Sequence, residues 1–549
     1  MCNPDTHPDA FQRPLSQNAS MQQADVIIVG AGSAGCVLAD RLTESGRLQV
    51  LVLEAGGRDS HPWIHIPMGY GKLFNHPTLN WSYESEPEPH CNGRRIFTPR
   101  GKVLGGSSSI NGLVYIRGQA QDFDLWNIPG WSYADLLPSF IKAEDQSRGA
   151  NEWHGTGGPF AVSDLPDQHP LCEAFIASAQ AIGVPRNDDF NGATQEGAGY
   201  FQANTRHGRR ISTAAGYLKR ARKRPNLRLE VHAHTTRILF EGRRAVGVEY
   251  LQNGQRHQVR AGHVILAGGA FNSPQLLQLS GIGPGALLRQ HGIEVVHDLP
   301  DVGAHLQDHF YVRNFFRSRL PITVNDDMAH WWGRLGMGLR WALQRRGPLA
   351  ISAGYAAAFV KTRPELVRPD AQFYFINFSL AKRGGVLDRH SGFTCSVSQL
   401  QAKSRGWVKL RSADPLAAPL IQYNYLDNAD DRQTMVDALK LLRRLVQTPP
   451  FSDHVAEEIK PGPGVITDEQ WLQYCREVGD TVYHPTSTCR LGTDEASVVD
   501  PQLRVRGTQG LWVMDASIMP SVVSGNTNAA TVAIAEKGAD LFLANAEGL

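Results

Sequence analysis

The sequence predicts an α/β protein, in which a parallel sheet of buried strands carries an inserted α+β domain built on an antiparallel sheet. The first observation is a set of short, continuous apolar runs at residues 26–29, 50–53 and 264–267, the last of which follows His263. Strands that are buried on both faces have this pattern, whereas half-exposed strands alternate apolar with polar residues. The second observation is a change of composition between about residues 310 and 447, where strand-like segments predominate and predict the antiparallel sheet.

The first apolar strand ends at Gly30, and Gly32 and Gly35 complete the spacing G-x-G-x-x-G before a predicted helix over residues 33–45. These glycines permit a tight turn, close approach of the backbone to a pyrophosphate and close packing of helix on strand. The second strand ends at Glu54, 19 residues after Gly35, where an acid can bind ribose hydroxyls. Structural glycines are the alternative, but the order of elements favours a Rossmann-type dinucleotide site. The motif does not distinguish NAD from FAD.

Residues 100–112 form a loop with two adjacent glycines, three serines and an asparagine, which leads into the apolar residues 113–116. Such a loop is accessible along its backbone and rich in hydrogen-bonding groups. A structural serine turn is the alternative interpretation. The other predicted elements, in chain order, are a helix within 122–148, strands at 227–231, 236–240 and 245–250, strands at 371–378, 394–400 and 406–410, a strand at 510–515 and a helix at 528–544.

Residues 330–341 are apolar and predicted to be helical, with Arg340, Arg345 and Arg346 at the carboxyl-terminal end. We favour a helix packed over the antiparallel sheet. A lid or a membrane-facing patch is the alternative.

Length and composition limit the class of protein. A chain of 549 residues is expected to divide into more than one folding unit. Hydrophobic residues at 42% and charged residues at 20% are typical of globular proteins, and the net charge of +2 gives no reason to expect a nucleic-acid partner. Seven cysteines without a C-x-x-C pair predict reduced thiols and a cytoplasmic location.

Residues 1–23 lack the apolar core of a secretory signal, so we expect a flexible tail, and Met21 is an alternative start of translation. No apolar run approaches the ~18 residues of a spanning helix. Contact with the inner face of a membrane is left open, as is the oligomeric state.

Two segments together, residues 100–112 and 269–283, resemble the two signature patterns of the glucose-methanol-choline (GMC) oxidoreductases. Further likenesses lie at residues 404–410, 484–490 and 513–520, in the order that the family has them. The resemblance implies a flavoprotein with FAD extended from residues 30–54 towards the inserted sheet. Some relatives attach the flavin through a histidine at the position that corresponds to Ile110, so we expect FAD to bind non-covalently here.

The resemblance also implies which residues bind the cofactor. Glu54 is expected at the adenosine ribose, Thr235 near the adenine through its backbone, and the helix end near Thr531 at the flavin pyrimidine. The expected cofactor-binding residues are Gly30, Gly32, Ser33, Ala34, Gly35, Glu54, Ala55, Val103, Gly105, Ser107, Asn111, Gly112, Leu113, Val114, Thr235, Tyr483, Asp515, Ala516 and Thr531.

The resemblance assigns catalysis to His484 and Asn528. Removal of a hydride from an alcohol carbon requires the hydroxyl proton to leave, and imidazole has a suitable pKa for accepting it. Asn528 follows His484 by 44 residues, and its carboxamide can orient the substrate oxygen. A helix N-cap is the structural alternative for Asn528. His232 and His234 lack a third ligand at metal-site spacing, so we expect no metal site.

The resulting hypothesis is an FAD-dependent dehydrogenase that oxidises a primary alcohol to an aldehyde and passes electrons to a quinone-like acceptor. An oxygen-using oxidase, a flavin-containing hydroxynitrile lyase and a non-enzymatic flavoprotein are the alternatives. The expected organisation is a tail (1–23), an FAD-binding domain in three parts (24–160, with the flavin loop at 100–114; 226–309; 461–549), a connecting segment (161–225) and a substrate-binding domain (310–460).

Overall fold

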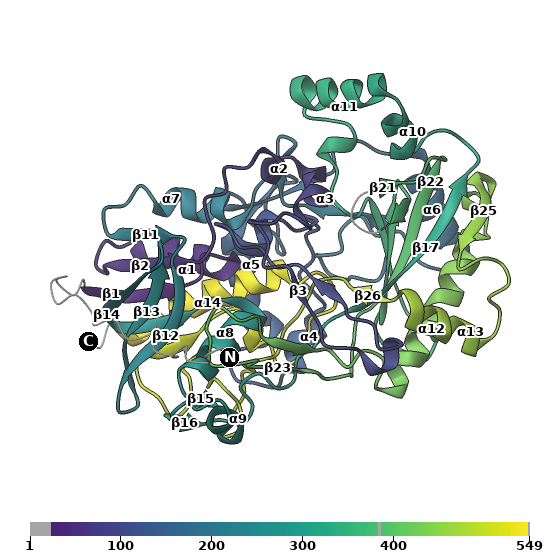
Figure 1. Ribbon diagram of the computed structural model, residues 1–549. Helices are drawn as coiled ribbons and strands as arrows, with labels where there is room; N and C mark the ends of the chain where they lie inside the picture. The colour runs from purple at the N-terminus through teal and green to yellow at the C-terminus, as the bar shows by residue number, and fades with distance from the viewer. Residues whose placement is uncertain (1–22, 383–385, 547–549) are drawn as a thin grey trace, which may run out of the picture.

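The computed structural model describes residues 23–382 and 386–546 and contains two seven-stranded sheets, which lie on opposite sides of the view in Figure 1. The α/β fold class predicted from the sequence is confirmed, with one sheet largely parallel and the other antiparallel. The flexible tail predicted at residues 1–23 lies outside the described residues except for Gln23, which begins the first strand.

The first sheet has a parallel part whose strands are neighbours in the order β11, β2, β1, β14 and β27. β14 is longer than predicted because its first half pairs antiparallel with β13, and β13 pairs with β12. The strands are β1 (Gln23–Val29), β2 (Val50–Glu54), β11 (Leu227–Val231), β12 (His234–Glu241), β13 (Arg244–Gln252), β14 (Gln255–Leu266) and β27 (Leu511–Val513).

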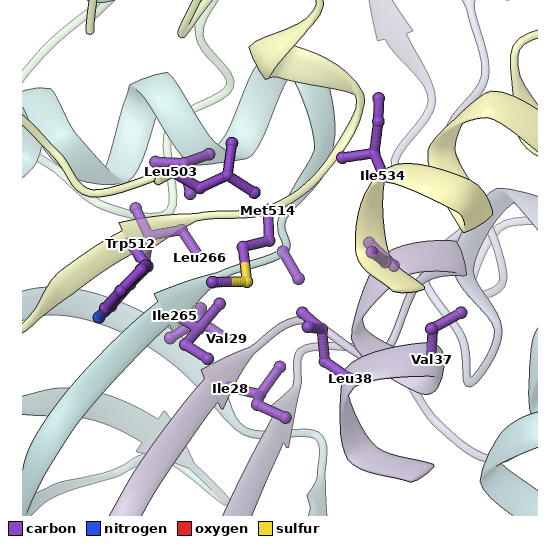
Figure 2. Packing of buried hydrophobic residues seen from close by; sticks show 14 of the residues in the cluster. Ile28, Val29, Val37, Leu38, Ile265, Leu266, Leu503, Trp512, Met514 and Ile534 are labelled. Atoms are coloured by element: carbon purple, nitrogen blue, oxygen red, sulfur yellow. The ribbon is translucent and has the colours of Figure 1, made fainter. Parts of the chain in front are cut away.

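Helices α1 (Ser33–Thr43) and α14 (Asn528–Ala546) pack against the parallel strands. Figure 2 shows Leu38 of α1 and Ile534 of α14 on the same side of the strands as Met514, which follows β27. Burial of these apolar side chains stabilises the layer. Both helices begin beside the carboxyl ends of the strands, so their N-termini lie at the edge where ligands bind in sheets of this type.

The second sheet is antiparallel, with the strand order β25, β17, β22, β19, β18 and β7, and β26 beside β17. Helices α6 (Pro170–Ala181) and α12 (Ala429–Val446) share one hydrophobic core with it. Its strands are β7 (Gly197–Tyr200), β17 (Phe310–Ser318), β18 (Ala356–Val360), β19 (Ala371–Ile376), β22 (Gly392–Gln399), β25 (Val455–Lys460) and β26 (Asp480–Thr481). β7 and β26 come from segments in which the sequence indicated no strand of this sheet.

Successive residues of β17 face opposite sides of the second sheet, as the period of a strand requires. Val312 belongs to the core shared with α6 and α12, whereas Tyr311 and Arg313 line a cavity on the other side. The inner face of the second sheet is therefore a wall of that cavity.

Three predicted elements differ from the structure. The helix within residues 122–148 ends early: α4 (Ala120–Asp124) and α5 (Tyr133–Ala143) are followed by the strand β5 (Glu144–Gln146), where the buried Glu144 accepts hydrogen bonds instead of continuing the helix. The strand predicted at 406–410 forms, but as β23 it pairs with β24 outside the second sheet.

The third difference concerns residues 330–341. They form α11 (Trp331–Gln344), which packs beside α10 (Val324–Ala329) and the turn Pro348–Ala350 at the edge of the molecule (Figure 1). Most of its large apolar side chains are exposed. The favoured prediction, a helix packed over the sheet, is therefore wrong.

The remaining helices and strands are short connecting elements. They are α2 (Pro62–His65), α3 (Tyr70–Leu73), α7 (Lys219–Ala221), α8 (Gly269–Leu279), α9 (Gly285–Gln290), α13 (Asp468–Val478), β3 (Tyr83–Glu84), β4 (Phe97–Thr98), β6 (Phe160–Asp164), β8 (Gln202–Ala203), β9 (Thr205–Arg206), β10 (Arg209–Arg210), β15 (Ile282–Gly283), β16 (His297–Asp298), β20 (Leu380–Lys382), β21 (Val386–Leu387), β23 (Trp407–Lys409) and β24 (Leu420–Gln422). Among the described residues, no helix is long and apolar enough to cross a membrane.

Candidate active site

A cavity of about 720 Å³ extends from the carboxyl ends of β1 and β2 to the inner face of the second sheet. Clefts of this size, at this edge of a parallel sheet, are typical sites for cofactors and substrates. The cavity joins the glycine motif, the loop at residues 100–112 and the segment around His484, which are far apart in the sequence.

Most of the residues predicted to bind the cofactor line this cavity, together with both predicted catalytic residues. Those that line it are Gly30, Gly32, Ser33, Ala34, Glu54, Ala55, Ser107, Asn111, Gly112, Leu113, Val114, Thr235, Tyr483, His484, Asp515, Ala516, Asn528 and Thr531.

Gly35, Val103 and Gly105 do not line the cavity. A Cβ at Gly35 would lie 1.9 Å from the carbonyl oxygen of Gly30, so its glycine permits close contact of α1 with the end of β1. Val103 is buried among apolar neighbours. Gly105 has a φ of +85° and donates its N–H to Ala31 O at 2.7 Å, which attaches the flavin loop to the glycine motif.

Glu54, the last residue of β2, lies at the predicted adenosine end of the cavity. Its Oε2 accepts a hydrogen bond from Ala31 N and its Oε1 accepts one from Gly56 N, both at 2.8 Å. Burial raises the pKa of Glu54 to about 7. The backbone therefore orients this carboxyl group beside the glycine motif.

Several buried polar atoms along the cavity have no hydrogen-bond partner among the described residues. They are Thr235 Oγ1, Asn526 Oδ1 and Asn528 Nδ2. Buried polar groups are nearly always satisfied, so these atoms indicate a polar ligand along the cavity. The N-terminus of α1 at Ser33 adds free N–H groups that suit phosphates. The residues present therefore fit an extended dinucleotide such as FAD.

His484 follows β26 and contacts His309, which directly precedes β17. The two Nδ1 atoms lie 2.9 Å apart, and the rings are perpendicular. His309 Nε2 lies 3.1 Å from Leu400 O. A carbonyl oxygen only accepts, so His309 carries its proton on Nε2. Burial lowers the pKa of His309 to about 4, so this ring is neutral and its Nδ1 is an acceptor.

This pairing fixes the tautomer of His484. Because His309 Nδ1 accepts, His484 must donate from its own Nδ1, and its Nε2 carries the lone pair of the ring. Asn526 Nδ2, which only donates, lies 3.1 Å from that Nε2 and agrees with this assignment. Burial, followed by His309 and Arg100, holds the pKa of His484 well below its ordinary value. The ring is therefore a neutral base with Nε2 available at the cavity.

The backbone around His484 is held in place by its neighbours. Asp308 Oδ1 accepts from His484 N at 2.7 Å, and Asp308 Oδ2 accepts from the hydroxyl groups of Thr481 and Tyr425. Arg100 donates to Tyr483 O at 2.8 Å. Tyr483 has a φ of +73°, an unfavourable conformation for a non-glycine residue, and these bonds sustain it.

Asn526, which the sequence did not single out, lies beside His484. Asn528, which was predicted to be catalytic, instead accepts a hydrogen bond through Oδ1 from the hydroxyl group of Ser33 at 2.7 Å. The structure thus brings Asn526 to the predicted catalytic histidine and Asn528 to the N-terminus of α1. Both side chains line the cavity.

The part of the cavity farthest from the glycine motif, here called the outer chamber, is lined mainly by apolar and aromatic side chains. Its residues are Met68, Tyr70, Phe74, Tyr311, Arg313, Val324, Met328, Met337, Leu349, Tyr374, Ile376, Phe378, Leu380 and Leu387. Among the described residues that line the whole cavity, the only carboxylates are Glu54 and Asp515. Asp515 accepts from Gly269 N and Ser273 Oγ, so both belong to the cofactor end.

Comparison with known proteins agrees with this geometry. The two models of the GMC oxidoreductases match residues 24–311 and 402–535. The chain belongs to the GMC oxidoreductase family. The predicted family resemblance is confirmed, and with it FAD as the cofactor and the class of oxidoreductases that act on CH–OH donors.

Two similar relatives come from Pseudomonas putida. An alcohol dehydrogenase [acceptor] is 44% identical over 528 residues, which cover 94% of this chain and 95% of the relative. An oxygen-dependent choline dehydrogenase from strain GB-1 is 43% identical over 530 residues, which cover 94% of each chain. Both relatives support a GMC enzyme that acts on alcohols.

Solved structures show the same fold. Pyridoxine 4-oxidase from Mesorbium loti has a TM-score of 0.86 and 29% identity, with 95% of this chain and 99% of that chain covered. A formate oxidase from Aspergillus oryzae RIB40 has a TM-score of 0.90 and 26% identity, with 97% and 100% covered.

Sequence reasoning missed His309, Asn526 and Arg313. Asn526 had a visible indication, because it is the first asparagine of Asn526-Thr-Asn528 and carries the same functional group. His309 and Arg313 flank the start of β17, and only the pairing of β17 with β26 brings them to His484 and the chamber.

Proposed function

We propose that this GMC oxidoreductase oxidises an uncharged primary alcohol to an aldehyde, with His484 Nε2 as the base. The observation that carries the proposal is the tautomer of His484, which leaves a neutral nitrogen as a hydrogen-bond acceptor at the cavity, where it accepts from Asn526 Nδ2. When FAD is bound in the cavity, it supplies the acceptor for the hydride that leaves the alcohol carbon. We further propose that FAD is held without a covalent bond.

In this proposal the alcohol O–H replaces Asn526 Nδ2 as the donor to His484 Nε2 and transfers its proton there as the C–H bond breaks. The proton release avoids a protonated carbonyl product and lowers the barrier. Asn526, in place of Asn528, donates from Nδ2 to the substrate oxygen and stabilises its developing negative charge. Asp308 keeps the ring in position through the backbone of His484.

We also propose which residues hold the cofactor. FAD would be held by the cavity-lining residues of the glycine motif, by Glu54, by the flavin loop and by the start of α14. The phosphates of the dinucleotide would lie at the N-terminus of α1. Gly35, Val103 and Gly105 would act through packing and loop position rather than contact.

The outer chamber favours an uncharged substrate. Arg313 lines it and is permanently charged, the buried Asp480 close to it offsets part of that charge, and no described carboxylate lines this part of the cavity. A quaternary ammonium group would therefore lose its hydration without gaining a carboxylate partner on the chamber wall, and the remaining positive charge of Arg313 would repel it. An apolar or aromatic alcohol would instead bury its chain against the chamber wall.

We propose a quinone-like compound rather than oxygen as the electron acceptor, which the relative named alcohol dehydrogenase [acceptor] supports. An oxygen-using oxidase is the second candidate, because two related structures are oxidases. We also propose peripheral contact with the inner face of the cytoplasmic membrane.

The deciding experiment is anaerobic reduction of the flavin by an alcohol in the purified holoenzyme and in a His484→Ala variant. We expect the variant to retain FAD, measured by its absorption spectrum, and to be reduced ~10²-fold more slowly or worse. Reduction of the variant at a nearly normal rate would refute the role of His484. A wild-type enzyme whose flavin no alcohol bleaches would refute oxidation itself and favour a lyase.

A further inference from the structure

We propose that α11 is an interfacial helix that binds this enzyme to the surface of an anionic lipid bilayer. In this orientation the side of the outer chamber that α10 and α11 line is the side nearest to the lipid. The inference deepens the peripheral membrane contact proposed above. It identifies the surface that makes the contact and the chemistry of the lipid that it recognises.

The first argument is an exposed apolar stripe along α11. Trp331, Leu335, Leu339 and Leu343 are 69%, 53%, 50% and 80% exposed, and the adjacent Trp332 is 58% exposed. Steps of four residues place the first four on one face of the helix. A contiguous apolar surface of this kind marks an interaction site, whereas isolated exposed apolar residues do not.

The second argument is the charge around the stripe. Residues 324–349, which include α10, contain four arginines, Arg334, Arg340, Arg345 and Arg346, against two aspartates, Asp326 and Asp327. Helices that lie in the interface of anionic membranes carry Trp and Leu on one face and Arg beside them, as α11 does. Arg340 and Arg346 contact Asp167, whereas Arg345 stacks on Trp341 at 4.3 Å.

The charge also favours lipid over a second copy of the chain. In a two-fold symmetric dimer the same patch meets itself, so the arginines of two α11 helices would be brought together. Lipid phosphates would neutralise them instead. A spanning helix is not needed for this mode of attachment, since the helix lies parallel to the surface.

The third argument is the stability of α11 itself. Gly333, Gly336 and Gly338 lower its helical propensity, and a helix of 14 residues is marginal in water. Met337 is its one fully buried apolar side chain among the residues described. A lipid surface would bury the stripe and stabilise the helix.

The fourth argument is the position of α11 relative to the cavity. Met337 lies on the opposite face from Leu335 and Leu339 and lines the outer chamber, as do Met328 and Leu349. One helix thus separates the exposed stripe from the chamber. Seating on lipid places the proposed substrate site within about one helix diameter, ~10 Å, of the bilayer surface.

Co-sedimentation of the full-length holoenzyme with vesicles tests the inference. The vesicles contain phosphatidylcholine alone or phosphatidylcholine with phosphatidylglycerol. We expect binding to the anionic vesicles, weaker binding at high salt, and a loss of about tenfold or more in a Leu339→Gln/Leu343→Gln variant. The matched control is Leu416→Gln/Ile466→Gln, which changes two side chains of similar exposure (63% and 71%) elsewhere.

Three results would overturn the inference. In the first, the wild-type enzyme does not sediment with anionic vesicles. In the second, the stripe variant binds the vesicles as well as the control variant does. In the third, the wild-type enzyme is a dimer in solution and the stripe variant is a monomer. The last result would identify a second copy as the partner. Flavin content and reduction by a water-soluble alcohol, measured without vesicles, report on the proposed function separately, because the stripe residues do not line the cavity.

Discussion

His309 Nδ1 lies 2.9 Å from His484 Nδ1, and this contact determines which nitrogen of His484 can act as a base. The two residues are 175 positions apart. They meet because β26, which precedes His484, pairs with β17, which follows His309. The tautomer of His484 therefore depends on the pairing between these two strands.

We predict that His309→Phe slows flavin reduction by about 10²-fold while FAD stays bound, because His484 loses the acceptor that holds its proton on Nδ1. His309→Asn retains a side-chain acceptor and should recover much of the rate. Stopped-flow reduction under anaerobic conditions measures both variants. Equal rates in the two variants would indicate that His309 acts only by filling space.

The second prediction separates the two asparagines. Asn526→Ala should slow flavin reduction by about 10²-fold, because Asn526 is the donor beside His484 Nε2. Asn528→Ala should leave the rate nearly unchanged and weaken FAD retention, because Ser33 loses its partner. The measurements are single-turnover rates and the FAD content after dialysis. The reverse outcome would restore the catalytic assignment of Asn528 that the sequence suggested.

The third prediction concerns pH. A base must be neutral to accept a proton, and the pKa of His484 is held below its ordinary value mainly by burial. The rate constant of flavin reduction should therefore stay constant as the pH falls to about 6.5 and decline only below it. A pH series of single-turnover rates at saturating alcohol tests this. A half-maximal rate above about pH 7 would contradict the predicted direction of the shift.

The fourth prediction compares choline with 3,3-dimethyl-1-butanol, an uncharged alcohol of the same shape. The uncharged compound should reduce the flavin with a kcat/KM about 10²-fold higher, because only choline brings a positive charge near Arg313. The two compounds match in size, so steric exclusion would affect both equally. A preference for choline would show that Asp480 neutralises Arg313 and that the aromatic side chains of the chamber bind the cation.

The fifth prediction concerns the glycine motif. Gly35→Ala should lower the melting temperature and the FAD content, because the added Cβ would lie 1.9 Å from Gly30 O and push α1 away from β1. Gly464→Ala is the matched control, because no atom lies within 4 Å of its added Cβ. Thermal unfolding followed by flavin fluorescence measures both. Similar melting temperatures of the Gly35→Ala and Gly464→Ala variants would show that α1 can shift without loss of stability.

The parallel sheet could be predicted from the sequence because residues that are close together in the chain specify its first strands and helix. Continuous apolar runs and the glycine spacing specify β1, α1 and β2 within one short stretch. The second sheet was harder to predict, since its edge strand β7 is a short segment with two glycines, Gly197 and Gly199, and gains its structure from pairing with β18.

The candidate site was only partly predictable for the same reason. Residues near a motif, such as Glu54 and Ser107, were placed at the cavity correctly by position. The choice between Asn526 and Asn528 depends on where α14 begins, because residues two apart near a helix start point in different directions. The sequence does not give that orientation.

The alternation of side chains along β17 separates two properties of the enzyme. Tyr311 and Arg313 face the outer chamber, whereas His484 arrives on a different segment and the glycine motif belongs to a different sheet. Under the proposed function, substitutions on this one strand would change which alcohol is accepted and leave the proposed base and cofactor site in place.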